Sequence, residues 1–123
     1  MNKLFFKDEH LMIKDMVRDF AKSRIIPVAR ELDNSQKFPS EIVKQMGELG
    51  LMGILVPEKY GGAGLDMVAF STAIIELGRA DASVAITMAA HNSLGTLPLL
   101  TFGSKKQKDK YLPGLLEGKD FWC

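Results

Sequence analysis

The sequence has a single cysteine and no long hydrophobic run. Cys123 is the last residue, so no disulfide can form within the chain, and its cysteine usage gives no sign of an oxidising compartment. No stretch approaches the ~20 apolar residues of a membrane-spanning helix. The segment before the first predicted helix, near Asp8, is too short for a signal or transit peptide. We therefore expect a cytoplasmic protein, and a bacterial source is the simplest interpretation.

An excess of charge of either sign is also absent. The chain of 123 residues carries 16 lysine and arginine residues against 15 aspartate and glutamate residues, a formal net charge of +1. Proteins that bind nucleic acid or anionic membranes need a basic surface, so we expect neither kind of partner. The hydrophobic content of 46% and the charged content of 25% are typical of one soluble globular domain.

Apolar residues recur at helical spacing over most of the chain. They predict a first helix from Asp8 to about Ile26, where Pro27 should end or kink it. A polar connector is expected over residues 33–39, and a short amphipathic helix over residues 40–49.

Three later helices have capping signals at their amino-terminal ends. In chain order these are Asp66 before residues 67–78, Asp81 before residues 82–94, and Ser104 with Gln107 before a last helix that Gly118 ends. The helix over residues 82–94 is apolar on nearly every side, so we expect it to be central and buried, with Ile86 in the core. Gly95 and Pro98 should end that helix. The fold class predicted is all-α, an irregular bundle of about five helices.

Residues 51–66 are the least helical part and contain glycine at positions 61, 62 and 64. A dinucleotide-binding fingerprint would need a further glycine at position 67, where Met67 stands, and the Gly-Lys-Ser/Thr of a P-loop is absent. We interpret the stretch as a tight, ordered turn between helices. At least one of its three glycines should have a positive φ.

No self-contained catalytic or metal site is predicted. His10 lies on the polar side of the first helix and should be solvated. His91 lacks a second ligand at metal-binding spacing, which favours a hydrogen-bonded histidine near a helix end, and Ser93 lacks the context of a nucleophile. Near the carboxyl end are four lysines: Lys105, Lys106, Lys108 and Lys110. Gln107 and Asp109 interrupt them, so we interpret them as a solvated helix face, with partner binding as the less favoured alternative.

The stretch Leu49–Asp66 resembles the signature of the amino-terminal domains of acyl-CoA dehydrogenases. It reads Leu-Gly-Leu-Met-Gly-Ile-Leu-Val-Pro-Glu-Lys-Tyr-Gly-Gly-Ala-Gly-Leu-Asp, and those domains pair an Leu-Gly-hydrophobic-x-Gly run with a Pro-Glu-x-Tyr-Gly-Gly-x-Gly loop. Three further segments agree in order and spacing: Met12–Ala21, Ala89–Gly95 and Phe102–Pro113. The resemblance covers essentially the whole chain, so residues 1–123 are expected to form one amino-terminal helical domain of this family.

The resemblance implies a parent enzyme with a central β domain and a carboxy-terminal helical bundle after this domain. Family members use FAD to oxidise acyl-CoA thioesters to trans-2-enoyl products; a glutamate removes the α proton while the β hydrogen leaves as hydride to the flavin. The Thr-Glu-Pro-x-x-Gly-Ser-Asp flavin segment and the bundle that carries the glutamate are absent from this sequence. The chain is therefore expected to be part of a longer enzyme, with no catalytic or cofactor-binding residue of its own. Alone, it should neither hold FAD nor be active.

The resemblance also implies substrate-facing residues and partners. Carried over by position, Ile86, Thr87, Ala90 and Leu94 would line the acyl-chain pocket, with ordinary core packing as the alternative. The implied partners are an acyl-CoA substrate, electron-transfer flavoprotein and further copies of the subunit in a homotetramer. Two other functions stay open: an autonomous helical binding module that kept the fold without the chemistry, and the same domain from an acyl-CoA oxidase.

Overall fold

The computed structural model describes residues 5–121, and every regular element in that range is helical. The elements join into five continuous helical segments, which confirms the predicted all-α bundle. Two short 3-10 turns, η2 (Leu51–Gly53) and η3 (Glu58–Tyr60), lie between the second and third segments. The segments are α1–η1–α2 (Asp8–Phe20, Ala21–Ile25, Ile26–Ser35), α3 (Ser40–Glu48), α4 (Met67–Ala80), α5–η4–α6 (Ala82–Ala90, His91–Thr96, Leu97–Phe102) and α7 (Lys105–Leu116).

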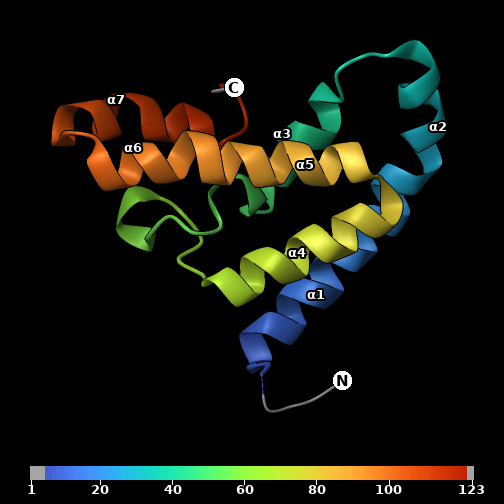
Figure 1. Cartoon of the computed structure of the whole chain (residues 1–123), viewed down its shortest axis with the longest axis horizontal. Helices are drawn as coiled ribbons and strands as arrows, with labels where there is room; N and C mark the ends of the chain where they lie inside the picture. Colours follow the sequence, from blue (N-terminus) through green and yellow to red (C-terminus); the bar gives the residue numbers. More distant parts are fainter. Residues whose placement is uncertain (1–4, 122–123) are drawn as a thin grey trace.

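The core lies between α1, α4 and α5. Figure 1 shows α1 and α4 side by side, with α5 and α6 running across the molecule and α7 beside α6. Val17 of α1, Met46 of α3 and Leu77 of α4 are fully buried members of the main core cluster. A second, smaller cluster around Leu112 and Leu115 joins α7 to α6 and to the loop after η2. Among residues 5–121, no helix combines the length and the apolar character needed to cross a membrane.

Pro27 does not end the first helix, which was one of the two outcomes predicted for it. The chain stays helical to Ser35, so residues 33–35 of the predicted connector are helical too. A π-helical segment, η1, comes just before Pro27, which occupies the first turn of α2. Proline normally breaks a helix because it lacks an N–H and its ring clashes with the carbonyl four residues back. The wider π turn accommodates that defect, and the helix continues.

The helix that begins at Ala82 shows the same arrangement. Gly95 and Pro98 were expected to end it, but it continues to Phe102 through the π-helical segment η4, and Pro98 lies in the first turn of α6. Both prolines therefore follow a π segment and begin a new α-helical stretch. Each of the two long helical segments, α1–η1–α2 and α5–η4–α6, is therefore one continuous helix with a widened turn in its middle, and no loop interrupts it.

The helix over residues 82–94 is not centrally buried, which corrects a second prediction. Only one side packs inward, through Val84, Ala85 and Met88. Ile86 is 67% exposed and Leu94 is 70% exposed, so Ile86 does not belong to the core. Its apolar composition does not say which side is covered: α4 packs against α5, and η2 and α7 pack against η4, while the opposite side stays exposed.

The predicted capping and turn residues are confirmed. Asp66 accepts the N–H of Ala69, Asp81 accepts those of Ser83 and Val84, and Ser104 with Gln107 forms the capping box of α7. The helix after Asp66 runs two residues beyond its predicted end, to Ala80.

Glycines supply the backbone angles that the turns need. Gly61 and Gly64 have φ of 89° and 64°, as predicted for the glycine-rich stretch, and Gly118, with φ of 70°, follows the end of α7. Gly62 is required for another reason, because a Cβ there would collide with the backbone of Val56.

Candidate functional site

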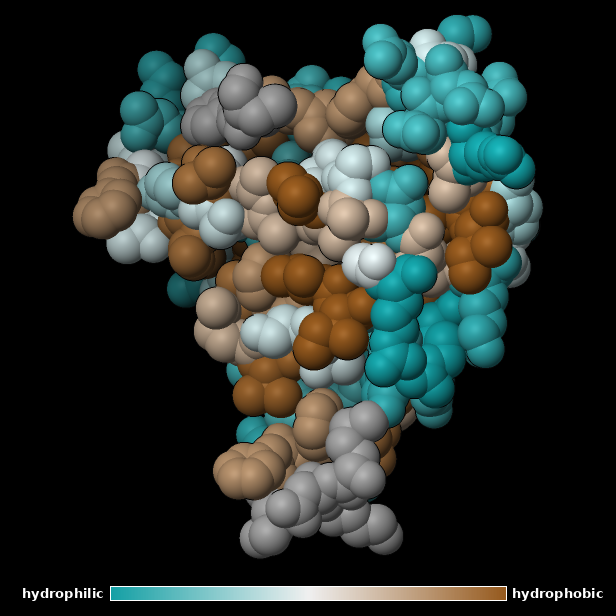
Figure 2. All heavy atoms as spheres, turned by 45° about the vertical axis from the view of Figure 1, so that its right-hand side comes forward, coloured by the Kyte–Doolittle hydropathy of each residue, from teal (hydrophilic) through white to brown (hydrophobic). Residues whose placement is uncertain are grey.

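The outward side of α5 and η4 is an exposed apolar face. Ile86, Ala90 and Leu94 follow one another at four-residue spacing, with Ala90 half-buried between two strongly exposed side chains. Figure 2 shows hydrophobic side chains gathered over α4 and α5 on one face of the molecule. The exposed apolar side chains of α4 are Met67, Val68 and Ile75. Contiguous apolar surface of this kind marks a place where a soluble protein binds something.

The hydroxyl groups on this helix do not make the face polar. Thr87 Oγ1 donates to the Ser83 carbonyl at 2.8 Å, and Ser93 Oγ donates to the Ala89 carbonyl at 2.8 Å. Each hydroxyl hydrogen is thus used on the helix's own backbone four residues earlier. A ligand on this face would meet mainly carbon, which suits an apolar chain better than a polar group.

The inward side of the same segment is held by buried polar side chains. Asn92 Nδ2 donates to the carbonyls of Leu51 and Met88, both at 2.9 Å, and Asn92 is fully buried. His91 Nε2 donates to the Leu115 carbonyl at 2.8 Å, which confirms that this histidine is hydrogen-bonded, although the helix continues past it and does not end there as predicted. Burial lowers the pKa of His91, so its ring is neutral near pH 7. These bonds tie η4 to η2 and α7 and give the exposed face a rigid backing.

The glycine-rich loop cannot cradle a phosphate. Each backbone N–H from Tyr60 to Leu65 donates to a carbonyl of residues 53–58, at distances of 2.8 to 3.2 Å. A phosphate-binding loop presents free N–H groups to its ligand, and here none of these six is free. The interpretation of this stretch as a tight turn is therefore confirmed.

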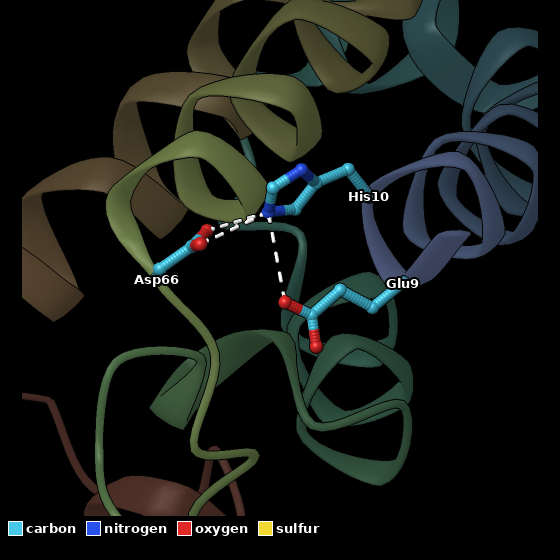
Figure 3. A group of neighbouring side chains, drawn as sticks. All are labelled: Glu9, His10 and Asp66. Carbon is cyan, nitrogen blue, oxygen red and sulfur yellow. Dashed lines mark hydrogen bonds and ion pairs between the residues drawn. The ribbon is translucent and has the colours of Figure 1, made fainter. Parts of the chain in front are cut away.

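His10 is buried, contrary to its predicted exposure. It is 2% exposed, and its Nε2 lies 2.9 and 3.0 Å from the two carboxylate oxygens of Asp66 (Figure 3). Its Nδ1 accepts the backbone N–H of Lys7 at 3.0 Å. The polar side of the first helix is covered here by the start of α4, which lies 56 residues away in sequence. The histidine therefore joins the first turns of α1 and α4.

Glu9, His10 and Asp66 lie close enough together to suggest a metal site. The oxygen of Glu9 is 3.8 Å from His10 Nε2, and the three ligand atoms are within 4.8 Å of one another. Since Nδ1 accepts a hydrogen bond from Lys7, the neutral ring carries its proton on Nε2. A metal on Nε2 would require that proton to move to Nδ1, and the bond from Lys7 would be lost. The geometry therefore favours a helix clamp over a metal centre.

A second polar contact between α1 and α4 was not predicted. Arg18 Nε and Nη2 donate to the two carboxylate oxygens of Glu76, each at 3.1 Å, and Glu76 is only 3% exposed. The pair raises the pKa of Arg18 above its ordinary value, first through the hydrogen bond. The two residues are 58 positions apart, and neither helix alone contains a signal for the pairing.

The chain matches a family of known proteins over nearly its whole length. Residues 7–119 match the family "Acyl-CoA dehydrogenase, N-terminal domain". An acyl-CoA dehydrogenase of Bacillus subtilis is 47% identical over 110 residues, which are 89% of this chain and 29% of that protein. The chain therefore spans less than a third of the length of this curated relative.

Two solved structures share the fold along 98% of the chain. A chain in the structure of the electron transferring flavoprotein of Acidaminococcus fermentans has a TM-score of 0.90 and 36% identity, with 32% of that chain covered. An acyl-CoA dehydrogenase complexed with FAD from Bacillus anthracis has a TM-score of 0.82 and 38% identity, with 21% of that chain covered. Both likenesses are to one helical part of a much longer polypeptide.

Proposed function

This chain belongs to the acyl-CoA dehydrogenase family, as its amino-terminal domain, and we propose that it forms one wall of the acyl-chain pocket in a flavoenzyme that oxidises acyl-CoA thioesters. Residues 1–123 then act together with a central β domain and a carboxy-terminal bundle. The pocket residues are Ile86, Thr87, Ala90 and Leu94.

The single observation that carries this proposal is the exposed apolar face of α5 and η4. Ile86 and Leu94 are strongly exposed on it, and the small, half-buried Ala90 lies between them in sequence. The hydroxyl of Thr87 is already bonded to the helix backbone. A fatty acyl chain needs dry walls more than polar contacts, and this face offers them. Asn92 and His91 hold it rigidly from behind.

The chemistry of the reaction belongs to parts outside this chain. A bound flavin supplies the hydride acceptor, and the glutamate that removes the α proton lies in the carboxy-terminal bundle of the family. In this chain the loop amides are all used internally, so the glycine-rich turn does not offer FAD a phosphate site. Electron-transfer flavoprotein as electron acceptor, a homotetramer and a cytoplasmic location are further parts of the proposal.

The chain alone is expected neither to retain FAD nor to oxidise acyl-CoA, because it supplies neither a positioned base nor a flavin site. Gel filtration after mixing with excess FAD and a series of acyl-CoAs measures this. A stoichiometric flavin spectrum in the protein peak, bleached by substrate, would contradict the proposal. It would favour the alternative of an independently functioning module.

A chimera tests the pocket directly. This chain replaces the corresponding segment of the B. subtilis relative, which is 47% identical. If Ala90 faces the acyl chain, Ala90→Phe should lower kcat/KM for long acyl-CoAs about tenfold or more relative to short ones. Ser35→Phe, at an exposed position of α2, is the matched control and should leave that ratio unchanged. An unchanged ratio in the Ala90→Phe chimera would show that this face does not line the pocket.

The acyl-CoA oxidase alternative is tested on the native full-length parent enzyme, not on the chimera. If that enzyme consumes oxygen when acyl-CoA is supplied without an added electron acceptor, it is an oxidase.

A further inference from the structure

The short turn η3 meets α7 at an aromatic side chain, Tyr60. The Nζ of Lys59 lies 5.0 Å from the centre of its ring, and the Nζ of Lys108 lies 5.4 Å from the same centre. The two ammonium groups therefore come within about 10 Å of each other, the Debye length at 0.1 M salt. Lys105, one turn earlier on α7, also lies near Tyr60. The pKa of Lys105 is raised, mainly by its hydrogen bond to Asp109 and to a smaller extent by Tyr60.

The positive charge at this place is only partly neutralised. Among the residues that the structure describes, Asp109 is the one carboxylate in an ion pair with these lysines, and it pairs with Lys105 at 2.6 Å. Within residues 5–121, neither Lys59 nor Lys108 has an acidic side chain within ion-pair distance. Glu58, the nearest acidic residue in the loop, lies close to Gly64. Like charges held around one ring repel each other, and an external anionic group would relieve that repulsion.

We propose that Lys59, Tyr60, Lys105 and Lys108, together called the Tyr60 patch, dock an acidic segment of a protein partner. The patch is compact and has few cations, and the chain's net charge is only +1. Nucleic acids and anionic membranes are bound by broader basic surfaces. A protein segment with a few carboxylates matches the size of the patch, and tyrosine is common where proteins meet. The proposal does not depend on the acyl pocket, since the patch comes from different elements.

The two lysines reach the ring from separate parts of the chain, which explains why the sequence did not show the patch. Lys108 belongs to the lysine-rich start of α7, interpreted from the sequence as a solvated face. Lys59 comes from η3, 49 positions earlier in the numbering. The tight turn after Pro57 and the packing of α7 against the smaller core cluster bring them together.

A fluorescent peptide of twelve glutamates serves as the probe, and binding is followed by anisotropy with the whole chain at low salt. The variant is Lys59→Gln with Lys108→Gln. The matched control is Lys22→Gln with Lys44→Gln, which removes the same net charge at two exposed positions outside the patch. Circular dichroism verifies that both fold like the parent chain.

The patch variant should bind the peptide about fivefold more weakly than the control variant, because it loses the two cations that would contact the peptide. Equal weakening in both variants would overturn the proposal, because binding would then follow net charge alone. No saturable binding would overturn it too. Vesicles with 30% phosphatidylserine provide the last arm, and stronger, patch-dependent binding to them than to the peptide would assign the surface to a membrane instead.

Discussion

His10 and Asp66 join the first turns of two helices that lie far apart in the sequence. Asp66 serves both as the N-cap of α4, through the N–H of Ala69, and as the partner of His10. The Ala69 hydrogen bond contributes most to lowering the pKa of Asp66, followed by the bond from His10. One carboxylate thus starts one helix and attaches it to another. The glycine-rich turn, which ends at this residue, is held in place by the same contacts.

Asp66 should make the stability of the chain depend on pH. Its folded-state pKa is below the ordinary value of 3.8, so the ionised form stabilises the fold above that value. This contribution is lost as the pH falls through the lower, folded-state pKa. Asp66→Asn keeps an oxygen for both hydrogen bonds but removes the charge.

Urea unfolding of the parent chain and of Asp66→Asn, from pH 7 to pH 2.5, measures the effect. The parent should be the more stable at neutral pH, and the difference should shrink below about pH 4. Two curves that stay parallel over the whole range would show that the charge of Asp66 does not contribute.

The π-helical segments η1 and η4 explain why Pro27 and Pro98 do not divide the two long helices. In both η1 and η4 the chain widens by a π turn just before the proline-containing first turn of the next α-helix. The second π segment carries His91 and Asn92, whose inward bonds to neighbouring elements fix its position. Leu94, in the same segment, is directed outward. The widened turn therefore anchors one side of the helix and presents the other.

Replacing glycine by alanine should change the stability of the chain in opposite directions at Gly62, in the glycine-rich turn, and at Gly78, within α4. A Cβ at Gly62 would strike the carbonyl of Val56, which is backbone and cannot move aside, so Gly62→Ala should destabilise the chain by about 1–3 kcal/mol. A Cβ at Gly78, inside α4, would make an ordinary contact 3.8 Å from Ala85. Gly78→Ala should stabilise the chain by up to about 1 kcal/mol.

Thermal and urea denaturation of the two variants measure these changes. Equal effects of the two substitutions would show that the close approach at Val56 does not constrain the loop.

At the scale of the described molecule, residues 5–121, a packed core lies beneath an exposed apolar face over α4, α5 and η4. The main core draws on α1, α3, α4 and α5, while the outer faces of α4, α5 and η4 leave Ile75, Ile86 and Leu94 in contact with water. The proposed remainder of the enzyme would cover part of this surface. In the chain alone, burial by a second copy is the available means of reducing the exposed apolar area.

The isolated chain should therefore self-associate through this face. Ile86→Lys with Leu94→Lys should reduce association in sedimentation velocity runs, with little loss of stability because both side chains are more than two-thirds exposed. Met12→Lys changes an equally exposed apolar residue of α1 and is the control. A control that dissociates the oligomer as effectively would place the contact elsewhere, and a monomeric parent chain would refute the prediction.

Features set by neighbouring residues followed from the sequence itself. The caps at Asp66, Asp81 and Ser104 and the positive φ of Gly61 and Gly64 were predictable, because each depends on a side chain and backbone groups a few residues apart. The helical class followed from apolar spacing. The quoted segments carried the family assignment, since four of them match in order along the chain.

Only the tertiary structure decided which sides of those helices face inward. The burial of His10, the Arg18–Glu76 pair and the Tyr60 patch each join residues about 50 or more positions apart, beyond the reach of local periodicity. The exposure of Ile86 has the same origin. Apolar residues along a helix indicate that it is stabilised by burial. Which of its faces is buried within this chain depends on how α4 packs against α5.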